Sequence, residues 1–208
     1  MIPRSILITG CSSGIGLAAA RTLKSRGWRV LATARRPEDL ARLEREDGVE
    51  AIRLELSNQA SIEACAAEAL KRTDGKLLAL YNNAAYGVVG AMEDTPADLL
   101  RDHFQVNVIA ANELARRILP AMRRNRTGRI VNCSSVLGFV SGPYRGAYAA
   151  SKFALEAMTD AMRLEVRDAG IHVSLLEPGP IATSFMATTI ATFRRAIDME
   201  GSVHRDYY

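Results

Sequence analysis

The 208-residue chain contains 48% hydrophobic and 24% charged residues and carries a formal net charge of +4. These fractions are ordinary for a globular protein, and the length suits a single α/β domain, residues 1–208, with a sizeable core. Because basic residues are scattered, we expect no nucleic-acid partner. No apolar run approaches membrane-spanning length, so we expect no membrane span.

Short apolar segments alternate with amphipathic segments along the chain. The apolar segments predict strands at Ser5–Thr9, Arg29–Ala34, Glu50–Glu55, Leu77–Asn82, Arg129–Ser134 and His172–Leu176. The amphipathic segments predict helices near Gly14–Ser25, Glu38–Glu46, Ser61–Lys71, Pro96–Arg124 (broken near Asn107) and Tyr148–Ala169. This alternation indicates a parallel sheet covered on both faces. Right-handed crossovers then give a doubly wound sheet with strand order 3-2-1-4-5-6.

A glycine-rich turn joins the first predicted strand to the first predicted helix, in the segment Thr9–Gly16. Glycines allow the tight turn, and the N-terminus of the helix offers free N–H groups and a positive dipole end to a pyrophosphate. The spacing Gly-x-x-x-Gly-x-Gly differs from the commoner dinucleotide motif, and a plain strand-to-helix turn is the alternative. The candidate cofactor contacts are Gly10, Ser12, Ser13, Gly14, Ile15 and Gly16.

The end of the second predicted strand bears on the choice of cofactor. NAD sites usually place an acidic residue there to bind the ribose 2′-hydroxyl. This chain has Ala34-Arg35-Arg36 instead, and a guanidinium is a planar donor suited to phosphate. We therefore expect NADP(H) to bind better than NAD(H), with Arg35 and Arg36 near the 2′-phosphate. The alternative is that both arginines only begin a solvent loop.

Tyr148 and Lys152 lie four residues apart in a predicted helix. Residues at this spacing share one helix face, so the ammonium can approach the phenol. A nearby cation lowers a tyrosine pKa, and a tyrosine tuned in this way can act as a general acid or base. Alone, the pair is more often an ordinary exposed contact.

The order of these motifs resembles the short-chain dehydrogenase/reductase family. Four further segments match family positions, namely Asn82–Ala85, Asn107-Val108, Ile130–Ser135 and Pro178–Ile181. The resemblance implies that Tyr148 transfers the proton, that Lys152 holds the nicotinamide ribose, and that Ser135 rather than Ser134 orients the substrate oxygen. Asn107 would hold a water linking Lys152 to solvent. The further implied cofactor contacts are Glu55, Leu56, Asn83, Ala84, Ala85, Tyr148, Lys152, Pro178, Gly179, Ile181 and Thr183.

The resemblance also implies an activity. We expect hydride transfer between NADP(H) and an apolar aldehyde, ketone or alcohol, as in the branch that holds hydroxysteroid and retinol dehydrogenases and bacterial aldehyde reductases. A nucleotide-binding sensor or scaffold with little turnover is the main alternative, and a sugar-nucleotide epimerase is a weaker one. Phe139, Val140, Pro143, Tyr144, Phe185 and Met186 suggest an apolar pocket. A homodimer or homotetramer is implied, and a cytoplasmic location is expected because no signal peptide precedes the first strand.

Three remaining expectations concern the rest of the chain. Tyr208 falls in the family's substrate loop, about 182–208, so the last helix and strand should be missing and the loop mobile. The three histidines match no catalytic position and are expected near the surface. The cysteines Cys11, Cys65 and Cys133 lack metal-binding spacing, so free thiols and no metal site are expected.

Overall fold

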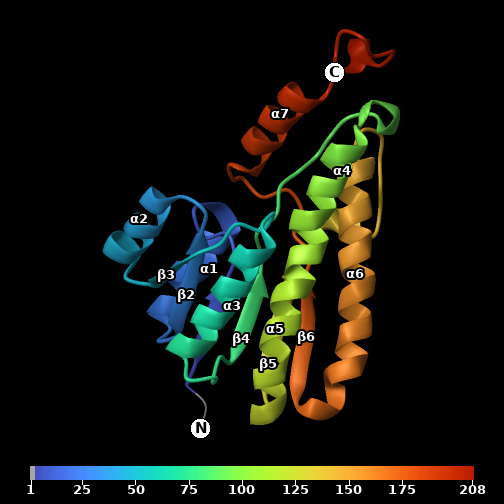
Figure 1. Cartoon of the computed structure of the whole chain (residues 1–208). Coiled ribbons are helices and arrows are strands. Elements are labelled where there is room, and N and C mark those ends of the chain that lie inside the picture. Colours follow the sequence, from blue (N-terminus) through green and yellow to red (C-terminus); the bar gives the residue numbers. More distant parts are fainter. Residues whose placement is uncertain (1–2) are drawn as a thin grey trace.

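Six parallel strands form the centre of the molecule, as seen in a computed structural model that describes residues 3–208 (Figure 1). In chain order the strands are β1 (Ser5–Ile8), β2 (Arg29–Ala34), β3 (Glu50–Arg53), β4 (Ala79–Asn82), β5 (Gly128–Cys133) and β6 (Ile171–Leu176). Their order in the sheet is β3-β2-β1-β4-β5-β6, so the predicted topology is confirmed. The predicted strands are one or two residues too long at several ends, and the last two begin one residue too late.

Helices cover both faces of the sheet. They are α1 (Gly14–Ser25), α2 (Pro37–Asp47), α3 (Gln59–Arg72), α4 (Ala97–Phe104), α5 (Ala110–Asn125), α6 (Gly146–Val166) and α7 (Phe185–Ala196). One apolar cluster joins the sheet to α3, α5 and α6, and a second joins it to α1 and α2. Short 3₁₀ turns follow at Met92–Asp94, Val136–Gly138, Arg167–Ala169 and Arg205–Tyr207. Among the described residues, no helix is both long and apolar enough to cross a membrane.

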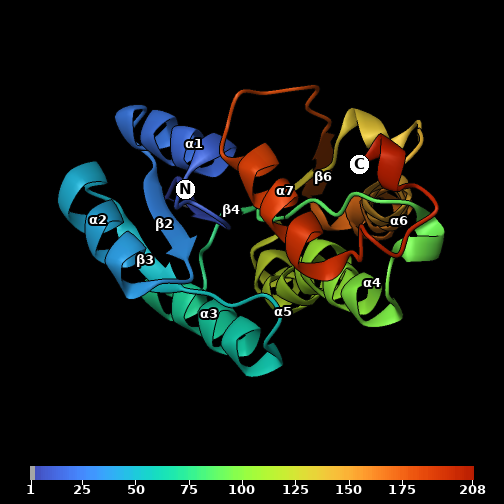
Figure 2. The ribbon, with the colours of Figure 1, turned by 90° about the horizontal axis from the view of Figure 1, so that it is seen from above.

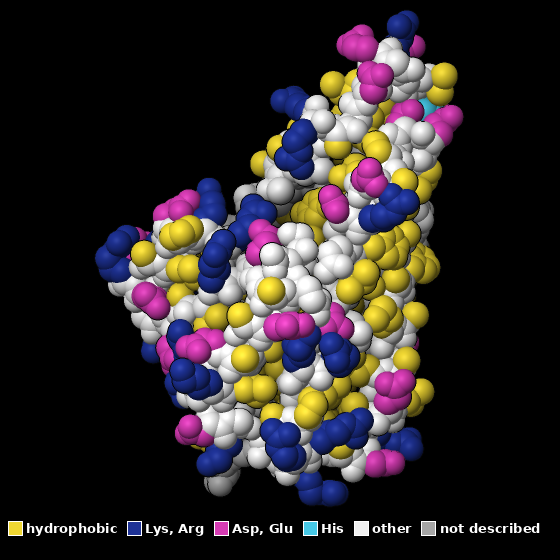
Figure 3. Space-filling model, viewed as in Figure 1, with side chains coloured by type: hydrophobic (Ala, Val, Ile, Leu, Met, Phe, Trp, Pro, Cys, Tyr) yellow, Lys and Arg dark blue, Asp and Glu magenta, His cyan; other side chains and the backbone are white. Residues whose placement is uncertain are grey.

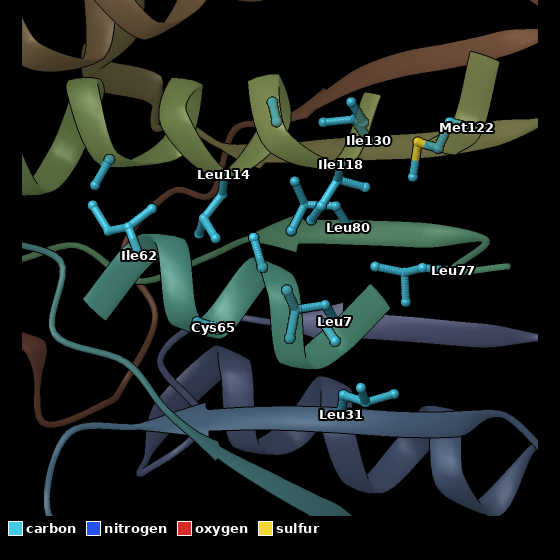
Figure 4. Close-up of a cluster of buried hydrophobic side chains, with 14 of the residues drawn as sticks. Leu7, Leu31, Ile62, Cys65, Leu77, Leu80, Leu114, Ile118, Met122 and Ile130 are labelled. Carbon is cyan, nitrogen blue, oxygen red and sulfur yellow. The ribbon is translucent and has the colours of Figure 1, made fainter. Parts of the chain in front are cut away.

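The first cluster is the main core. Leu7, Leu80 and Ile130 project from neighbouring strands against the apolar faces of α3 and α5 (Figure 4). All three side chains are fully buried, and burying one such side chain stabilises the fold by about 1.5–3 kcal/mol. The strands are apolar on both faces because helices cover both, which explains why they read as continuous apolar runs.

The predicted break near Asn107 is a π-helical stretch, Gln105–Ile109, between α4 and α5. The backbone remains helical on both sides, with φ −65° at Phe104 and −63° at Ala110, so the chain is not interrupted. Such stretches often occur at functional sites.

The C-terminal segment differs most from expectation. It forms α7, which the sequence did not predict, and α7 lies across the upper ends of the strands when viewed from above (Figure 2). The residues beyond α7 dock on the segment around Met92–Asp94, where the Tyr208 hydroxyl donates to Asp94 at 2.5 Å and accepts from the Ala91 N–H at 2.8 Å. In the structure, the segment that we expected to be mobile therefore packs against the rest of the fold.

Candidate active site

The glycine-rich turn leaves β1 and enters α1 as predicted. Gly10 and Gly14 have φ of +72° and +59°, values that favour glycine. A Cβ at Gly16 would overlap the carbonyl of Gly10 and lie 2.5 Å from Asn83 Nδ2. The first turn of α1 contains no acidic residue, so its dipole end is available to an anion. The turn thus fits a pyrophosphate.

Asn83 and Thr9 fix the shape of this turn from the end of β4. The Asn83 side chain donates to the Thr9 carbonyl at 2.9 Å and to the Gly10 carbonyl at 3.3 Å. The Thr9 hydroxyl accepts from the backbone N–H groups of Asn83 and Ala84, both at 2.9 Å. Asn83 and Ala84 therefore lie beside the turn, and the predicted cofactor contacts of Asn83, Ala84 and Ala85 remain predictions.

The predicted 2′-phosphate region lies at the ends of β2 and β3. The Arg35 side chain is 71% exposed and forms only a loose ion pair with Glu55 at 3.7 Å. The Arg36 guanidinium is engaged by Asp39 at 3.1 Å and Glu38 at 3.4 Å. Arg35 is thus the freer of the two for an anion. Leu56 is buried, and its carbonyl accepts from Gln105.

Arg42 is a residue of this region that the sequence reasoning missed. It projects from α2, and its guanidinium donates to the carbonyl of Ser12 at 2.6 Å, inside the glycine-rich turn. It also lies 3.4 Å from Asp39 and 3.9 Å from Asp47. An arginine in a helix with other charges carries no signal by itself, so only the fold could place it here.

The two serines after β5 point to different neighbours. Ser135 is 8% exposed, and its hydroxyl accepts from the Leu137 N–H at 3.2 Å and is linked to the Tyr148 phenol. Ser134 points away, and its hydroxyl would meet a Cβ at Gly138 at 2.7 Å. Only Ser135 therefore approaches Tyr148, which agrees with the predicted roles without testing them.

Tyr148 and Lys152 lie on the inner face of α6, with the ammonium 5.6 Å from the centre of the phenol ring. The prediction that the pKa of Tyr148 is lowered is wrong for this structure. Burial raises the pKa of Tyr148 to about 12, and the hydrogen bond with Ser135 lowers it only in part. Desolvation disfavours phenolate, so the phenol stays protonated at neutral pH. Sequence spacing could give the neighbour but not the burial.

Lys152 is itself buried, with 2% of its surface exposed. Its ammonium donates to the carbonyl of Cys133 at 2.7 Å. Burial lowers the pKa of Lys152 from 10.5 to about 8, and the negative charge of Glu156 one helical turn away opposes that effect. The cation is therefore held at the end of β5, beside Tyr148.

Asn107 lies in the π-helical stretch and is 3% exposed. Its carboxamide clamps one peptide, because Oδ1 accepts from the Tyr86 N–H at 3.1 Å and Nδ2 donates to the Tyr86 carbonyl at 3.0 Å. Nδ2 also lies 3.4 Å from the hydroxyl of Ser151. Asn107 thus joins the segment after β4 to α6, and the predicted water remains a prediction.

His103 corrects another expectation. It lies in α4, one turn before Asn107, and it is fully buried rather than near the surface. His172 is exposed, and His204 is partly exposed and 2.7 Å from Glu93. A lone histidine in an amphipathic helix carries no signal of its environment, so the sequence could not separate the three.

The loop after β6 closes the site from above. The Pro178 carbonyl accepts from Val136 at 3.2 Å, which ties the loop to the segment that carries Ser135. Thr183 is within 3.4 Å of where a Cβ of Gly14 would lie, and the hydroxyls of Ser13 and Ser184 are 3.0 Å apart. Gly179 and Ile181 are exposed. The loop therefore rests on the glycine-rich turn.

Helix α7 follows this loop and lies over Tyr148. The Phe185 ring meets the Tyr148 ring edge-on, with centroids 5.6 Å apart. A Cβ at Gly87 would overlap the Thr189 hydroxyl and lie 3.1 Å from the Phe185 ring. Of the predicted pocket residues, Phe185 thus lies at Tyr148, whereas Phe139 and Val140 are 60% and 59% exposed.

Comparison with known proteins agrees with this geometry. A family model described as short chain dehydrogenase matches residues 4–193. The chain is 45% identical over 185 residues to the uncharacterized oxidoreductase YbbO of Escherichia coli, covering 89% of this chain and 68% of that protein. It is 37% identical over 200 residues to human retinol dehydrogenase 8, covering 91% of this chain. The chain spans 62% of that relative's length.

Solved structures with a similar fold belong to the same family. A short-chain dehydrogenase from Streptomyces avermitilis superposes with a TM-score of 0.83 at 39% identity, covering 87% of this chain and 67% of that one. A short-chain dehydrogenase from Sphingobium yanoikuyae in complex with NADPH superposes with a TM-score of 0.81 at 30% identity, covering 97% and 77%.

Proposed function

Because the chain belongs to the short-chain dehydrogenase family, we propose that it transfers hydride between NADP(H) and an apolar aldehyde, ketone or alcohol. The observation that carries the proposal is the meeting of Tyr148, Ser135 and Lys152 beneath α7. They lie at the same edge of the sheet as the glycine-rich turn, which is where open α/β sheets bind ligands.

The roles of the residues follow from their chemistry. A bound nicotinamide supplies or accepts the hydride. Tyr148 gives a proton to the substrate oxygen in reduction and takes it back in oxidation. Its raised pKa, about 12, keeps the phenol in the protonated form that reduction needs. Ser135 orients the substrate oxygen, and Lys152 holds the ribose with its positive charge.

The charges at the end of β2 support NADP(H) over NAD(H). Ala34 carries no charge that would repel a 2′-phosphate, and the exposed Arg35 offers planar donors. Charge-assisted hydrogen bonds are worth about 1.5–3 kcal/mol each, so the preference should be about tenfold or more. Several similar solved structures are complexes with NADP or NADPH.

The substrate class follows from the groups around Tyr148. Phe185 covers the phenol edge-on, and the buried His103 packs between the rings of Tyr148 and Tyr86. Aromatic side chains around the hydroxyl groups of Tyr148 and Ser135 suit an apolar substrate that carries a single oxygen function.

We expect copies of the chain to assemble through the outer faces of α5 and α6. Phe153 and Leu164 on α6 are 44% and 69% exposed, and Ile109 beside α5 is 46% exposed. Figure 3 shows hydrophobic side chains on this side of the molecule, with Lys and Arg scattered over the surface. Light scattering after size-exclusion chromatography measures the oligomer.

Turnover is tested by following nicotinamide absorbance with a panel of apolar aldehydes and alcohols. Tyr148→Phe should lower the rate by about 10²–10⁴ because the proton transfer is lost, with cofactor affinity within a few-fold. Ser135→Ala should impair turnover strongly, and Ser134→Ala serves as its matched control. A parent that binds NADPH but turns over no member of the panel would favour the sensor alternative.

Cofactor choice is tested by titrating NADPH and NADH through nicotinamide fluorescence. Arg35→Ala should reduce NADPH affinity about tenfold or more and leave NADH affinity unchanged. Arg45→Ala is the control, because this α2 arginine is 71% exposed and pairs with Glu46. Equal affinities of the parent for both cofactors would refute the phosphate argument.

A further inference from the structure

His103 is a fully buried histidine that lies among residues of the proposed site. Its ring meets Tyr86 edge-on with centroids 5.0 Å apart, and it lies 6.2 Å from the ring of Tyr148. Its Nε2 is 3.3 Å from Nδ2 of Asn107. None of the roles assigned above uses this side chain.

The surrounding hydrogen bonds determine where the imidazole carries its proton. The Tyr86 N–H needs an acceptor, so Oδ1 of Asn107 must face it, and Nδ2 must then face the Tyr86 carbonyl. The second N–H of that amide is directed to the region of His103 Nε2. Nε2 therefore accepts a hydrogen bond, and a neutral ring carries its proton on Nδ1.

We propose that His103 is a positioning residue for the reaction: its neutral imidazole accepts from Asn107 and holds that amide, and with it the Tyr86 segment, against Tyr148. The proposal rests on the proposed function for its effect on turnover, but not for the state of the ring. A protonated imidazole would present an N–H to the Asn107 N–H group, so the contact would be lost.

Burial and the nearby positive charge of Lys152 keep His103 neutral. Lys152 and Tyr148 face it from α6, and Tyr86 faces it from the segment after β4. Burial, aided by the positive charge of Lys152, lowers the pKa of His103 from 6.5 to about 4. Within residues 3–208, its Nδ1 is buried and has no hydrogen-bond partner. A second proton would bind Nε2, where it would face the N–H of Asn107 and gain no acceptor.

The state of the ring is tested by ¹H–¹⁵N NMR of the histidine side chains, with His103→Gln to assign the signal. We expect the Nδ1–H tautomer and a titration midpoint for His103 near pH 4. The signal of the exposed His172 serves as the internal control, because it should be unchanged in His103→Gln. An Nε2–H tautomer, or an ordinary midpoint near that of a free histidine, overturns the proposal. This measurement needs no substrate, so it tests the protonation state of His103 even if the proposed function is wrong.

The effect on turnover is tested with His103→Leu and His103→Gln on the best aldehyde of the panel. The leucine removes the acceptor, so kcat should fall about tenfold, while the KM for NADPH stays within about threefold because the phosphate turn is not touched. The glutamine keeps an acceptor and should restore most of kcat. It should also lack the fall in kcat that the parent shows as pH approaches the midpoint of His103.

If His103→Leu does not fold, the proposal is tested by comparing the dependence of kcat on pH in the parent and in His103→Gln. Identical profiles, measured where circular dichroism shows both proteins folded, overturn the proposal. An unchanged kcat in a folded His103→Leu does so as well.

Discussion

Lys152 should destabilise the fold at neutral pH, and Lys152→Met should remove that cost. The ammonium is buried, and its hydrogen-bond partner is the carbonyl of Cys133 rather than a carboxylate. A buried charge that is not paired is disfavoured relative to water. Methionine has a similar length without the charge, so it isolates the effect of ionisation.

The magnitude follows from the pKa of Lys152, which burial lowers from 10.5 to about 8. Below about pH 8 the folded and unfolded chains both carry the proton, so the cost is constant. Between the two pKa values the unfolded chain binds more protons, so the free energy of unfolding rises with pH. Each pKa unit corresponds to 1.36 kcal/mol, so the total is about 3.4 kcal/mol.

Urea unfolding of the parent and Lys152→Met at several pH values measures this effect. From about pH 7 to about pH 10.5, the parent should gain about 3 kcal/mol relative to the variant. Titrations of other groups, such as the buried Cys11 and Cys65, are common to both proteins and cancel in the difference. Lys71→Met, at an exposed site on α3, is the control. A difference between the parent and Lys152→Met that does not change with pH would refute the reasoning.

Two further predictions concern acid stability and helix α7. Burial lowers the pKa of His103 to about 4, so its contribution is present above about pH 6.5 and lost as pH falls towards about 4. Over that range the parent should lose about 2.6 kcal/mol relative to His103→Gln, and parallel unfolding curves would contradict this. Gly87→Ala should displace α7 and raise the KM for the aldehyde, because a Cβ there meets Thr189 and Phe185. Gly142→Ala, with no atom within 4 Å of its Cβ, should leave KM unchanged, and equal KM values in both variants would contradict the placement of α7.

The sheet and the glycine-rich turn could be predicted because local sequence determines them. Apolar runs between amphipathic segments give the strands, and the tight contact at Gly16 requires a glycine at that position. Helix α7 could not be predicted in this way. It contains Thr188, Thr189 and Thr192, which are poor helix formers. Contacts of Thr189 and Phe185 with Gly87 hold it in place, and these connect residues about a hundred positions apart.

The pKa shifts of the site residues could not be predicted from the sequence either. The Tyr148–Lys152 spacing predicts a neighbouring cation correctly, but the sign of the shift in the pKa of Tyr148 depends on burial. The same holds for His103, because its own helical segment, which also carries Asn107, meets the segment around Tyr86 and helix α6 only in the fold. Spacing gives pairs of residues, whereas solvent exposure is a property of the whole fold.

The buried polar groups of the site oppose the stability of the fold. Burial moves the pKa values of Lys152 and His103 towards the uncharged form. The buried ammonium therefore costs stability at neutral pH, and the buried imidazole costs stability in acid. Each of these two side chains contacts a group proposed to act in turnover or to align it. The fold therefore keeps destabilising residues where the proposed hydride transfer would need a fixed cation and a neutral imidazole. Substitutions that stabilise the protein at these two positions should lower its turnover, whereas stabilising changes in the apolar core around Leu80 should not.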